Sequence, residues 1–176
     1  MLCPCAWGNT MGIEILEERF QDYKQKYPEH LSELASLAGQ IAGHQQRIRK
    51  LLGKVTPTLC ARCTNTCCSG IPCDGWFSTG DYFAYRMLYD VPEMQNAGSR
   101  SEWVNWSCSF LTDAGCSLPE DMRPLACIKV NCANLNRILE ERGDLPEFRR
   151  ICEAIDLIQT RLWELVAEHQ ESWAGR

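Results

Sequence analysis

The sequence predicts a mainly α-helical fold, in which N- and C-terminal helices pack around an irregular cysteine-rich core, with a short β-hairpin as an optional addition. Two observations carry this prediction. Apolar residues recur at helical spacing near both ends, and nine of the twelve cysteines lie within residues 60–132. A chain of 176 residues fits one domain. We expect residues 1–12 to form a flexible N-terminal extension and residues 13–176 to form that single domain.

The N-terminal region carries the first helical pattern. Pro28 interrupts it, so two helices are expected rather than one rod. Gly53 and then Pro57 end the pattern. The apolar positions are Ile13, Leu16, Phe20, Tyr23, Leu31, Leu34, Leu37, Ala38, Ile41, Ile48, Leu51 and Leu52. Such stripes are typical of faces that pack into a core.

The middle of the chain reads as mostly irregular. Residues 55–76 are rich in Thr, Cys, Gly and Pro, which favours a loop. Ser78 followed three residues later by Asp81 resembles a helix start and predicts a helix at about 79–89. Residues 90–107 are expected to form a loop. The turn sequence at 112–115 then predicts the hairpin between residues 110–111 and 116–118.

Two more helices are predicted at the C-terminal end. Pro124 is expected in the first turn of a helix that runs to about Arg142, with Gly143 as its stop. Asp144 and Pro146 begin the last helix. Its apolar face is Phe148, Ile151, Ile155, Ile158, Leu162, Leu165 and Val166.

Composition excludes several classes of function. A formal charge of -5 and a pI near 5.3 disfavour binding to nucleic acid. The apolar runs are far shorter than the ~20 residues needed to cross a bilayer, so no membrane association is expected. The first dozen residues do not resemble a secretory signal, and we expect a cytoplasmic location. Another protein is the partner class left open, and the oligomeric state is undetermined.

The cysteines are the chain's most distinctive chemical feature. Thiolates suit zinc and iron-sulfur clusters, and Cys60 with Cys63 forms a C-x2-C turn that can direct two sulfurs at one ion. In a reducing cytosol such a cluster indicates metal more than disulfides. Cys67 and Cys68 are adjacent, so an extended backbone would point them in opposite directions. One is expected to bind the first metal, while the other supports a second site or packs in the interior.

A closed site needs a ligand from further along the chain. Cys127 is the preferred one, because it is predicted near the start of a helix, where the dipole favours a thiolate. Cys152 is interpreted as packing, and Cys3 and Cys5 are left out of the site, as are the three histidines His30, His44 and His169. The predicted metal ligands are Cys60, Cys63, Cys67, Cys68, Cys108, Cys116 and Cys127.

The order of these cysteines resembles a known family. Cys60-x2-Cys63-x3-Cys67-Cys68, Cys108-Ser-Phe-Leu, Gly115-Cys116-Ser-Leu and Arg123-Pro124-Leu-Ala-Cys127 are similar to the YkgJ-like, or CxxCxxCC, proteins, described as zinc- or iron-chelating and related to flagellin lysine N-methylase. The resemblance covers about residues 60–132 and implies that residues 13–176 form a CxxCxxCC-type metal-binding domain. Two spacings are one residue longer than the family's, at residues 64–66 and at Met122. Cys73 and Cys132 are less regular in the family pattern. They are interpreted either as local substitutes for a ligand or as members of a second site.

The metal and the activity remain open at this stage. Four thiolates can hold a structural zinc ion or a 4Fe-4S cluster. We favour the iron-sulfur cluster with a redox or methyl-transfer-related role, because the resemblance reaches a methyl-transferring branch and because the cysteines are in surplus. The alternative is a zinc-stapled module for protein interaction, without catalysis. Whether the protein is an enzyme is uncertain: the C-x3-C-x2-C motif of radical enzymes is absent, and no catalytic residue can be named.

Overall fold

The computed structural model describes residues 13–53, 55, 59, 78–89, 111–112, 115–116, 123–129 and 132–167, and these are mainly helical, as predicted. The helices are α1 (Ile13–Lys26), the 3-10 turn η1 (Pro28–His30), α2 (Leu31–Leu52), α4 (Thr79–Leu88), α6 (Leu125–Lys129), α7 (Ala133–Glu141) and α8 (Leu145–Ala167). None of the described helices is long and apolar enough to cross a membrane.

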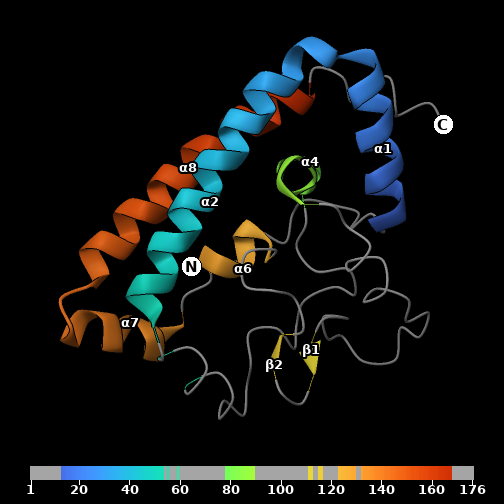
Figure 1. Ribbon diagram of the computed structural model, residues 1–176. Helices are drawn as coiled ribbons and strands as arrows, with labels where there is room; N and C mark the ends of the chain where they lie inside the picture. The colour runs from blue at the N-terminus through green and yellow to red at the C-terminus, as the bar shows by residue number, and fades with distance from the viewer. Residues whose placement is uncertain are drawn as a thin grey trace.

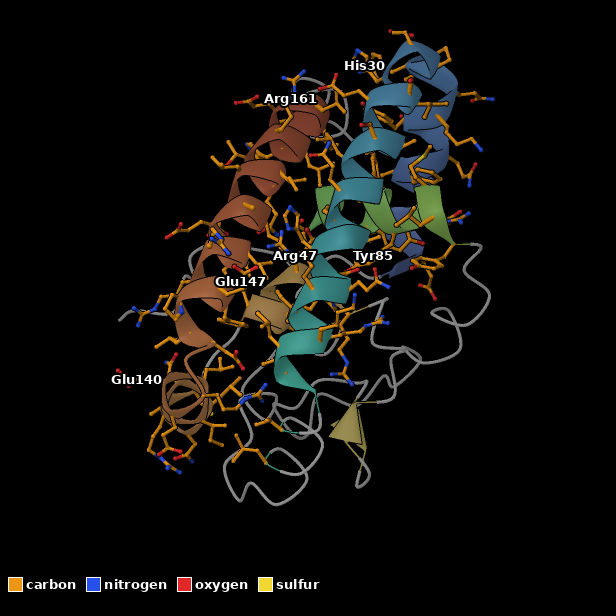
Figure 2. The ribbon with its side chains drawn as sticks, turned by 60° about the vertical axis from the view of Figure 1, so that its left-hand side comes forward. His30, Arg47, Tyr85, Glu140, Glu147 and Arg161 are labelled. Atoms are coloured by element: carbon orange, nitrogen blue, oxygen red, sulfur yellow. The ribbon has the colours of Figure 1, made fainter. Side chains whose placement is uncertain are left out.

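The two long helices α2 and α8 lie side by side and run in opposite directions (Figure 1). Two ion pairs between them fix this orientation. Glu33 near the start of α2 accepts a bond of 2.6 Å from Arg161, and Arg47 near its end pairs with Glu147 at the start of α8 (Figure 2). Exposed pairs of this kind contribute little stability. The packing of apolar side chains between the helices is therefore the main source of their association.

Helix α4 lies in the angle between α1 and α2 and also packs against α8 (Figure 1). Seven of its ten residues are buried. Gly80 allows the close approach to α8, because a Cβ at this position would lie 3.2 Å from Cβ of Leu162. The predicted start of the helix is confirmed, since the backbone N–H of Asp81 donates to Oγ of Ser78 at 3.0 Å.

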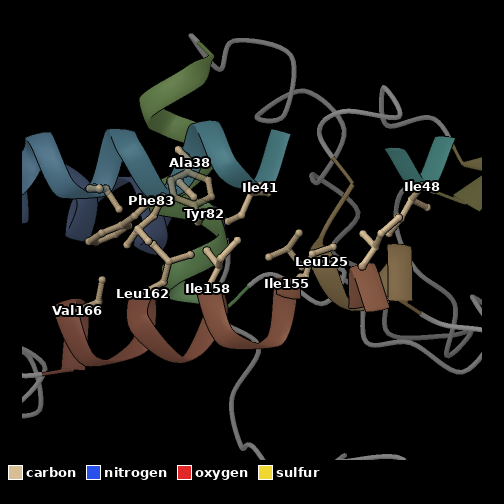
Figure 3. Close-up of a cluster of buried hydrophobic side chains, with 14 of the residues drawn as sticks. Ala38, Ile41, Ile48, Tyr82, Phe83, Leu125, Ile155, Ile158, Leu162 and Val166 are labelled. Carbon is tan, nitrogen blue, oxygen red and sulfur yellow. The ribbon is translucent and has the colours of Figure 1, made fainter. Parts of the chain in front are cut away.

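One hydrophobic core joins these elements (Figure 3). The predicted apolar face of the last helix is confirmed, because all seven of its residues are buried. The predicted stripe of the N-terminal helices is confirmed as well at the positions whose side chains are described. The core residues that Figure 3 labels are Ala38, Ile41, Ile48, Tyr82, Phe83, Leu125, Ile155, Ile158, Leu162 and Val166. Burial of aliphatic and aromatic groups on this scale dominates the stability of a helical domain.

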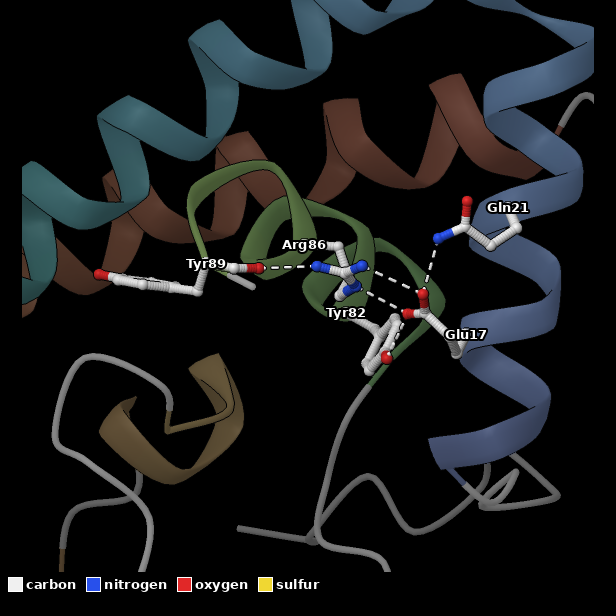
Figure 4. Close-up of polar contacts among 5 residues, drawn as sticks. All are labelled: Glu17, Gln21, Tyr82, Arg86 and Tyr89. Carbon is white, nitrogen blue, oxygen red and sulfur yellow. Dashed lines mark hydrogen bonds and ion pairs between the residues drawn. The ribbon is translucent and has the colours of Figure 1, made fainter. Parts of the chain in front are cut away.

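A partly buried ionic cluster joins α1 to α4 (Figure 4). Arg86 makes a two-pronged contact with Glu17, with Nε donating to Oε2 at 2.7 Å and a second nitrogen donating to Oε1 at 3.1 Å. The hydroxyl of Tyr82 and the amide of Gln21 each donate to the same carboxylate at 2.7 Å. These four donors outweigh the cost of partial burial and lower the pKa of Glu17 to about 2.

The structure corrects two predictions about secondary structure. The single helix expected from Pro124 to Arg142 is two helices, because Cys132 adopts an extended conformation and caps α7. Gly143 does end α7, with a φ of +75°. Val55 and Leu59 lie in the first part of the segment 55–76 that was predicted as loop. Both are helical and pack against the core.

A pair of two-residue strands completes the described elements. β1 (Leu111–Thr112) and β2 (Gly115–Cys116) pair antiparallel, with Leu111 opposite Cys116 and Thr112 opposite Gly115. The connecting residues 113 and 114 lie outside the described residues. The predicted hairpin turn therefore stays a prediction.

Candidate metal centre

The predicted ligands divide into two groups. Cys60, Cys63, Cys67, Cys68 and Cys108 lie outside the described residues, as does Cys73. Cys116 has its backbone in β2, and Cys127 lies in α6. Among residues that the structure describes, no three His, Cys, Asp or Glu side chains lie close enough together to hold a metal ion. The ligand set stays a prediction, and Cys127 is the predicted ligand whose side chain the structure describes.

Cys127 occupies the middle of the five-residue helix α6. Its backbone N–H donates to the carbonyl of Pro124 at 2.9 Å, and its side chain is half-buried. Leu125 is completely buried and Ile128 packs against the core. At about 100° per residue, Cys127 is roughly 160° from Leu125 around the helix. The sulfur therefore leaves α6 on the side opposite its main core contact.

The shortness of α6 corrects one argument made from the sequence. Cys127 was expected near the positive end of a long helix, but α6 spans little more than one turn. The aligned peptide dipoles are correspondingly few, so the helix dipole contributes less to a thiolate at Cys127 than predicted. The described contacts that hold α6 in place come from side chains of α2, α4 and α8.

The N-terminal end of α6 is held by Tyr85 of α4. The Tyr85 hydroxyl donates to the backbone carbonyl of Arg123, one residue before Pro124. Gln45 of α2 donates through Nε2 to the Tyr85 oxygen at 2.6 Å and to the same carbonyl at 3.5 Å. Burial raises the pKa of Tyr85 well above its ordinary value. The phenol therefore stays protonated and keeps its donor.

The C-terminal end of α6 is held by α8. Lys129 contacts both Asp156 and Gln159 through its ammonium group. The Gln159 amide also donates to Oδ1 of Asp81 on α4 at 3.0 Å. Three helices therefore meet around α6: α2 and α4 at one end, and α8 at the other.

Asp81 is a buried acid within this polar region. It is 1% exposed, and its second carboxylate oxygen, Oδ2, has no hydrogen-bond partner among the described residues. Burial raises the pKa of Asp81, while hydrogen bonds from Gln159 and Ser78 and the charge of Lys129 act in the opposite direction. An uncompensated buried carboxylate is costly, so the raised pKa favours the neutral acid.

The other two described cysteines differ from Cys127 and from each other. Cys132 is exposed, and its Sγ accepts the N–H of Leu135 at 3.4 Å. Cys152 is half-buried on α8 and packs against the core, as predicted. Burial, with smaller effects from Asp156 and Glu153, raises the pKa of the Cys152 thiol to about 11. Cys152 is thus protonated near neutral pH and poorly suited to bind metal.

The described histidines, His30 and His44, lie among packing residues of the helices. His30 Nδ1 lies 3.0 Å from the Tyr23 hydroxyl, and its ring stacks on Tyr27. The Tyr23 hydroxyl also donates to the carbonyl of Leu165 at 3.3 Å. Burial and the nearby Arg47 lower the pKa of His44. His169 lies outside the described residues.

Sequence reasoning missed the residues that surround α6. Tyr85 was not singled out, and Asp81 was interpreted only as part of a helix start. Gln45 was not singled out, although it is four residues after Ile41 and three before Ile48, on the buried stripe of α2. A polar residue on an otherwise apolar stripe is the signal that could have identified it.

Comparison with known proteins adds no family assignment. No family model, curated protein or solved structure matches this chain. The resemblance to the YkgJ-like proteins therefore remains a hypothesis that depends on the cysteine order alone.

Proposed function

We propose that the protein is a cysteine-ligated metalloprotein that holds an iron-sulfur cluster of the 4Fe-4S type. The observation that carries the proposal is the concentration of nine cysteines within residues 60–132, in the order C-x2-C-x3-CC followed by single cysteines at 108, 116 and 127. Four thiolates complete such a cluster. Cys60 and Cys63, one of the adjacent pair and Cys127 form the minimal set, with Cys108 and Cys116 as further ligands.

The cysteines whose side chains are described support a division between ligands and packing residues. Cys152, with its pKa raised to about 11, behaves as a packing residue. Cys132, which is not among the predicted ligands, caps α7 by accepting the backbone N–H of Leu135. Cys127 lies on a short helix held at both ends, which suits a ligand whose direction must be fixed.

A bound cluster would supply one-electron transfer, which makes a redox role the first expectation. The resemblance to relatives of flagellin lysine N-methylase adds a methyl-transfer-related role as an extension of the same hypothesis, with another protein as the partner. The chain's own contribution is the ligand set and the frame that orients it. We assign no catalytic residue.

Anaerobic purification followed by metal analysis tests the proposal. We expect absorbance near ~400 nm, together with iron and sulfide in similar amounts. Cys127→Ser should lower the iron content sharply, whereas Cys152→Ser, the control on α8, should retain it. A colourless protein that contains zinc and no sulfide would instead support the zinc-stapled interaction module. A protein that contains neither metal refutes both functions.

A further inference from the structure

The contacts around α6 are unusual in being polar and buried at the same time. Tyr85 is 1% exposed and Gln45 is 3% exposed, yet both direct hydrogen-bonding groups at one backbone carbonyl, that of Arg123. Removing these groups from water is costly unless their hydrogen bonds are made. An apolar pair would fill the same space but would leave the Arg123 carbonyl without these two donors. The polar pair therefore gives α6 a defined position that apolar packing alone does not specify.

A defined position matters because α6 cannot maintain its own geometry. A helix of five residues is far below the ~12–15 residues at which isolated helices become even marginally stable. The carbonyl of Arg123 directly precedes Pro124, whose own carbonyl accepts the backbone N–H of Cys127 at 2.9 Å. Fixing the first carbonyl consequently fixes the turn that carries Cys127. The Lys129 contacts to α8 hold the opposite end.

We propose that Tyr85, supported by Gln45, is a positioning residue that sets the direction of the Cys127 sulfur through the backbone carbonyl of Arg123. The part of this inference that concerns metal rests on the proposed function. The part that concerns Cys127 itself does not rest on the proposed function, because it depends only on hydrogen bonds between described residues.

The test replaces one hydroxyl at a time. Tyr85→Phe removes the donor to the Arg123 carbonyl, and Tyr82→Phe is a matched control. Tyr82 is also fully buried on α4, but its hydroxyl donates to Glu17 of α1 rather than to α6. Tyr85→Phe loses the bond to the Arg123 carbonyl and the one accepted from Gln45, and Tyr82→Phe loses the bond to Glu17, so both are expected to unfold at a lower temperature. Only Tyr85→Phe should affect Cys127.

The first measurement is the rate at which a chelator removes iron, which is monitored as the loss of absorbance. Mutation of residues that hydrogen-bond to metal ligands or orient them typically lowers metal affinity by about 10–100-fold. We therefore expect Tyr85→Phe to accelerate iron release by about tenfold. Tyr82→Phe should release iron at the rate of the unaltered protein. Equal acceleration in both variants would overturn the proposal, because it would indicate a general loss of stability.

The second measurement does not need bound metal. In chelator-treated protein whose helical content is verified by circular dichroism, the alkylation rate of Cys127 by iodoacetamide is followed by peptide mass spectrometry, with Cys152 as internal reference. Loss of the hydrogen bond from Tyr85 to the Arg123 carbonyl should raise the rate at Cys127 by about fivefold through more frequent opening of α6. Cys152 should be unchanged, as should both cysteines in Tyr82→Phe.

Gln45→Leu gives an independent variant, because Gln45 donates to the same carbonyl. If both residues act on this carbonyl, the effect of the double variant on Cys127 alkylation is smaller than the product of the single effects. An unchanged rate in Tyr85→Phe overturns the positioning role whether or not the protein holds metal. A protein without metal that shows the selective increase at Cys127 refutes the proposed function and leaves the positioning role supported.

Discussion

Replacing Glu17 by Gln should destabilise the protein in a way that depends on pH. The carboxylate accepts two bonds from Arg86, one from Tyr82 and one from Gln21. A glutamine cannot reproduce this arrangement, since its NH₂ group would face another donor. The substitution also leaves the Arg86 guanidinium, whose side chain is 14% exposed, without its carboxylate.

The magnitude follows from the pKa of Glu17, which is lowered from 4.5 to about 2. At 1.36 kcal/mol per pKa unit, this difference corresponds to about 3.4 kcal/mol. The Glu17 side chain is 20% exposed, so solvent screening reduces the expected contribution to about 2 kcal/mol. Between pH 4.5 and 2 the unfolded chain binds more protons than the folded one. The contribution is therefore complete above pH 4.5 and is lost as the pH falls toward 2.

Urea unfolding at a series of pH values measures this effect. At pH 7, Glu17→Gln should lower the free energy of unfolding by about 2 kcal/mol, and the difference from the unaltered protein should shrink as the pH approaches 2. Asp22→Asn is the control, because it removes an exposed pair with Lys26 on the same helix and should cost under about 0.5 kcal/mol. A loss equal at pH 7 and pH 2.5, or no loss at pH 7, would refute the reasoning.

Three further substitutions test the packing and the buried acid of α4, one of them on α2 as a control. Gly80→Ala should lower stability by about 1–2 kcal/mol, because the new Cβ would lie 3.2 Å from Cβ of Leu162. Gly39→Ala on α2 is the control, because its new Cβ would meet nothing within 4 Å, and it should raise stability by about 0.5–1 kcal/mol. Thermal unfolding compares the two variants. A higher melting temperature for Gly80→Ala than for Gly39→Ala would contradict the close crossing of α4 and α8. Asp81→Asn should stabilise the protein near neutral pH and lose this advantage below about pH 4. The folded state retains the Asp81 proton more strongly than the unfolded state, so the acid costs stability as the pH rises above its ordinary value of 3.8. Urea unfolding at pH 4 and 7 measures this difference, and a destabilised Asp81→Asn at pH 7 would indicate that the carboxylate is charged in the fold.

The long helices were predictable because their burial follows simple periodicity. Every residue of the predicted apolar face of α8 is buried, and Pro28 and Gly143 mark helix boundaries where backbone chemistry requires them. In both cases the sequence contains the cause locally: a repeat of 3.6 residues, a missing N–H or a residue that accepts positive φ. Tertiary contacts then reinforce what the local signals indicate.

The interruption between α6 and α7 was not predictable in the same way. Helix starts are recognised by Ser, Thr, Asp or Asn, whereas α7 is capped by the sulfur of Cys132. A cysteine at this position is read as a ligand or a packing residue, so the pattern from Pro124 to Arg142 resembled one helix. The consequence for the candidate site is direct, because the expected electrostatic support for Cys127 depended on that longer helix.

The polar contacts around α6 depend on pairs of residues that are far apart in sequence. Gln45 and Tyr85 are separated by 40 residues, and Asp81 and Gln159 by 78. Periodicity identifies the face on which each residue lies, but it does not identify the partner across the core. These residues therefore became candidates for a role at Cys127 only through the folded structure.

Helix α4 is the element through which stability and the position of Cys127 are connected. Tyr82 and Tyr85 lie three residues apart and are equally buried, yet one hydroxyl holds α1 through Glu17 and the other holds the turn before α6. A change that merely loosens α4 must affect both contacts. A change confined to Tyr85 should leave the ionic cluster at Glu17, and hence its pH dependence, intact. The two contacts therefore provide a physical criterion for separating a residue that positions Cys127 from one that only stabilises the fold.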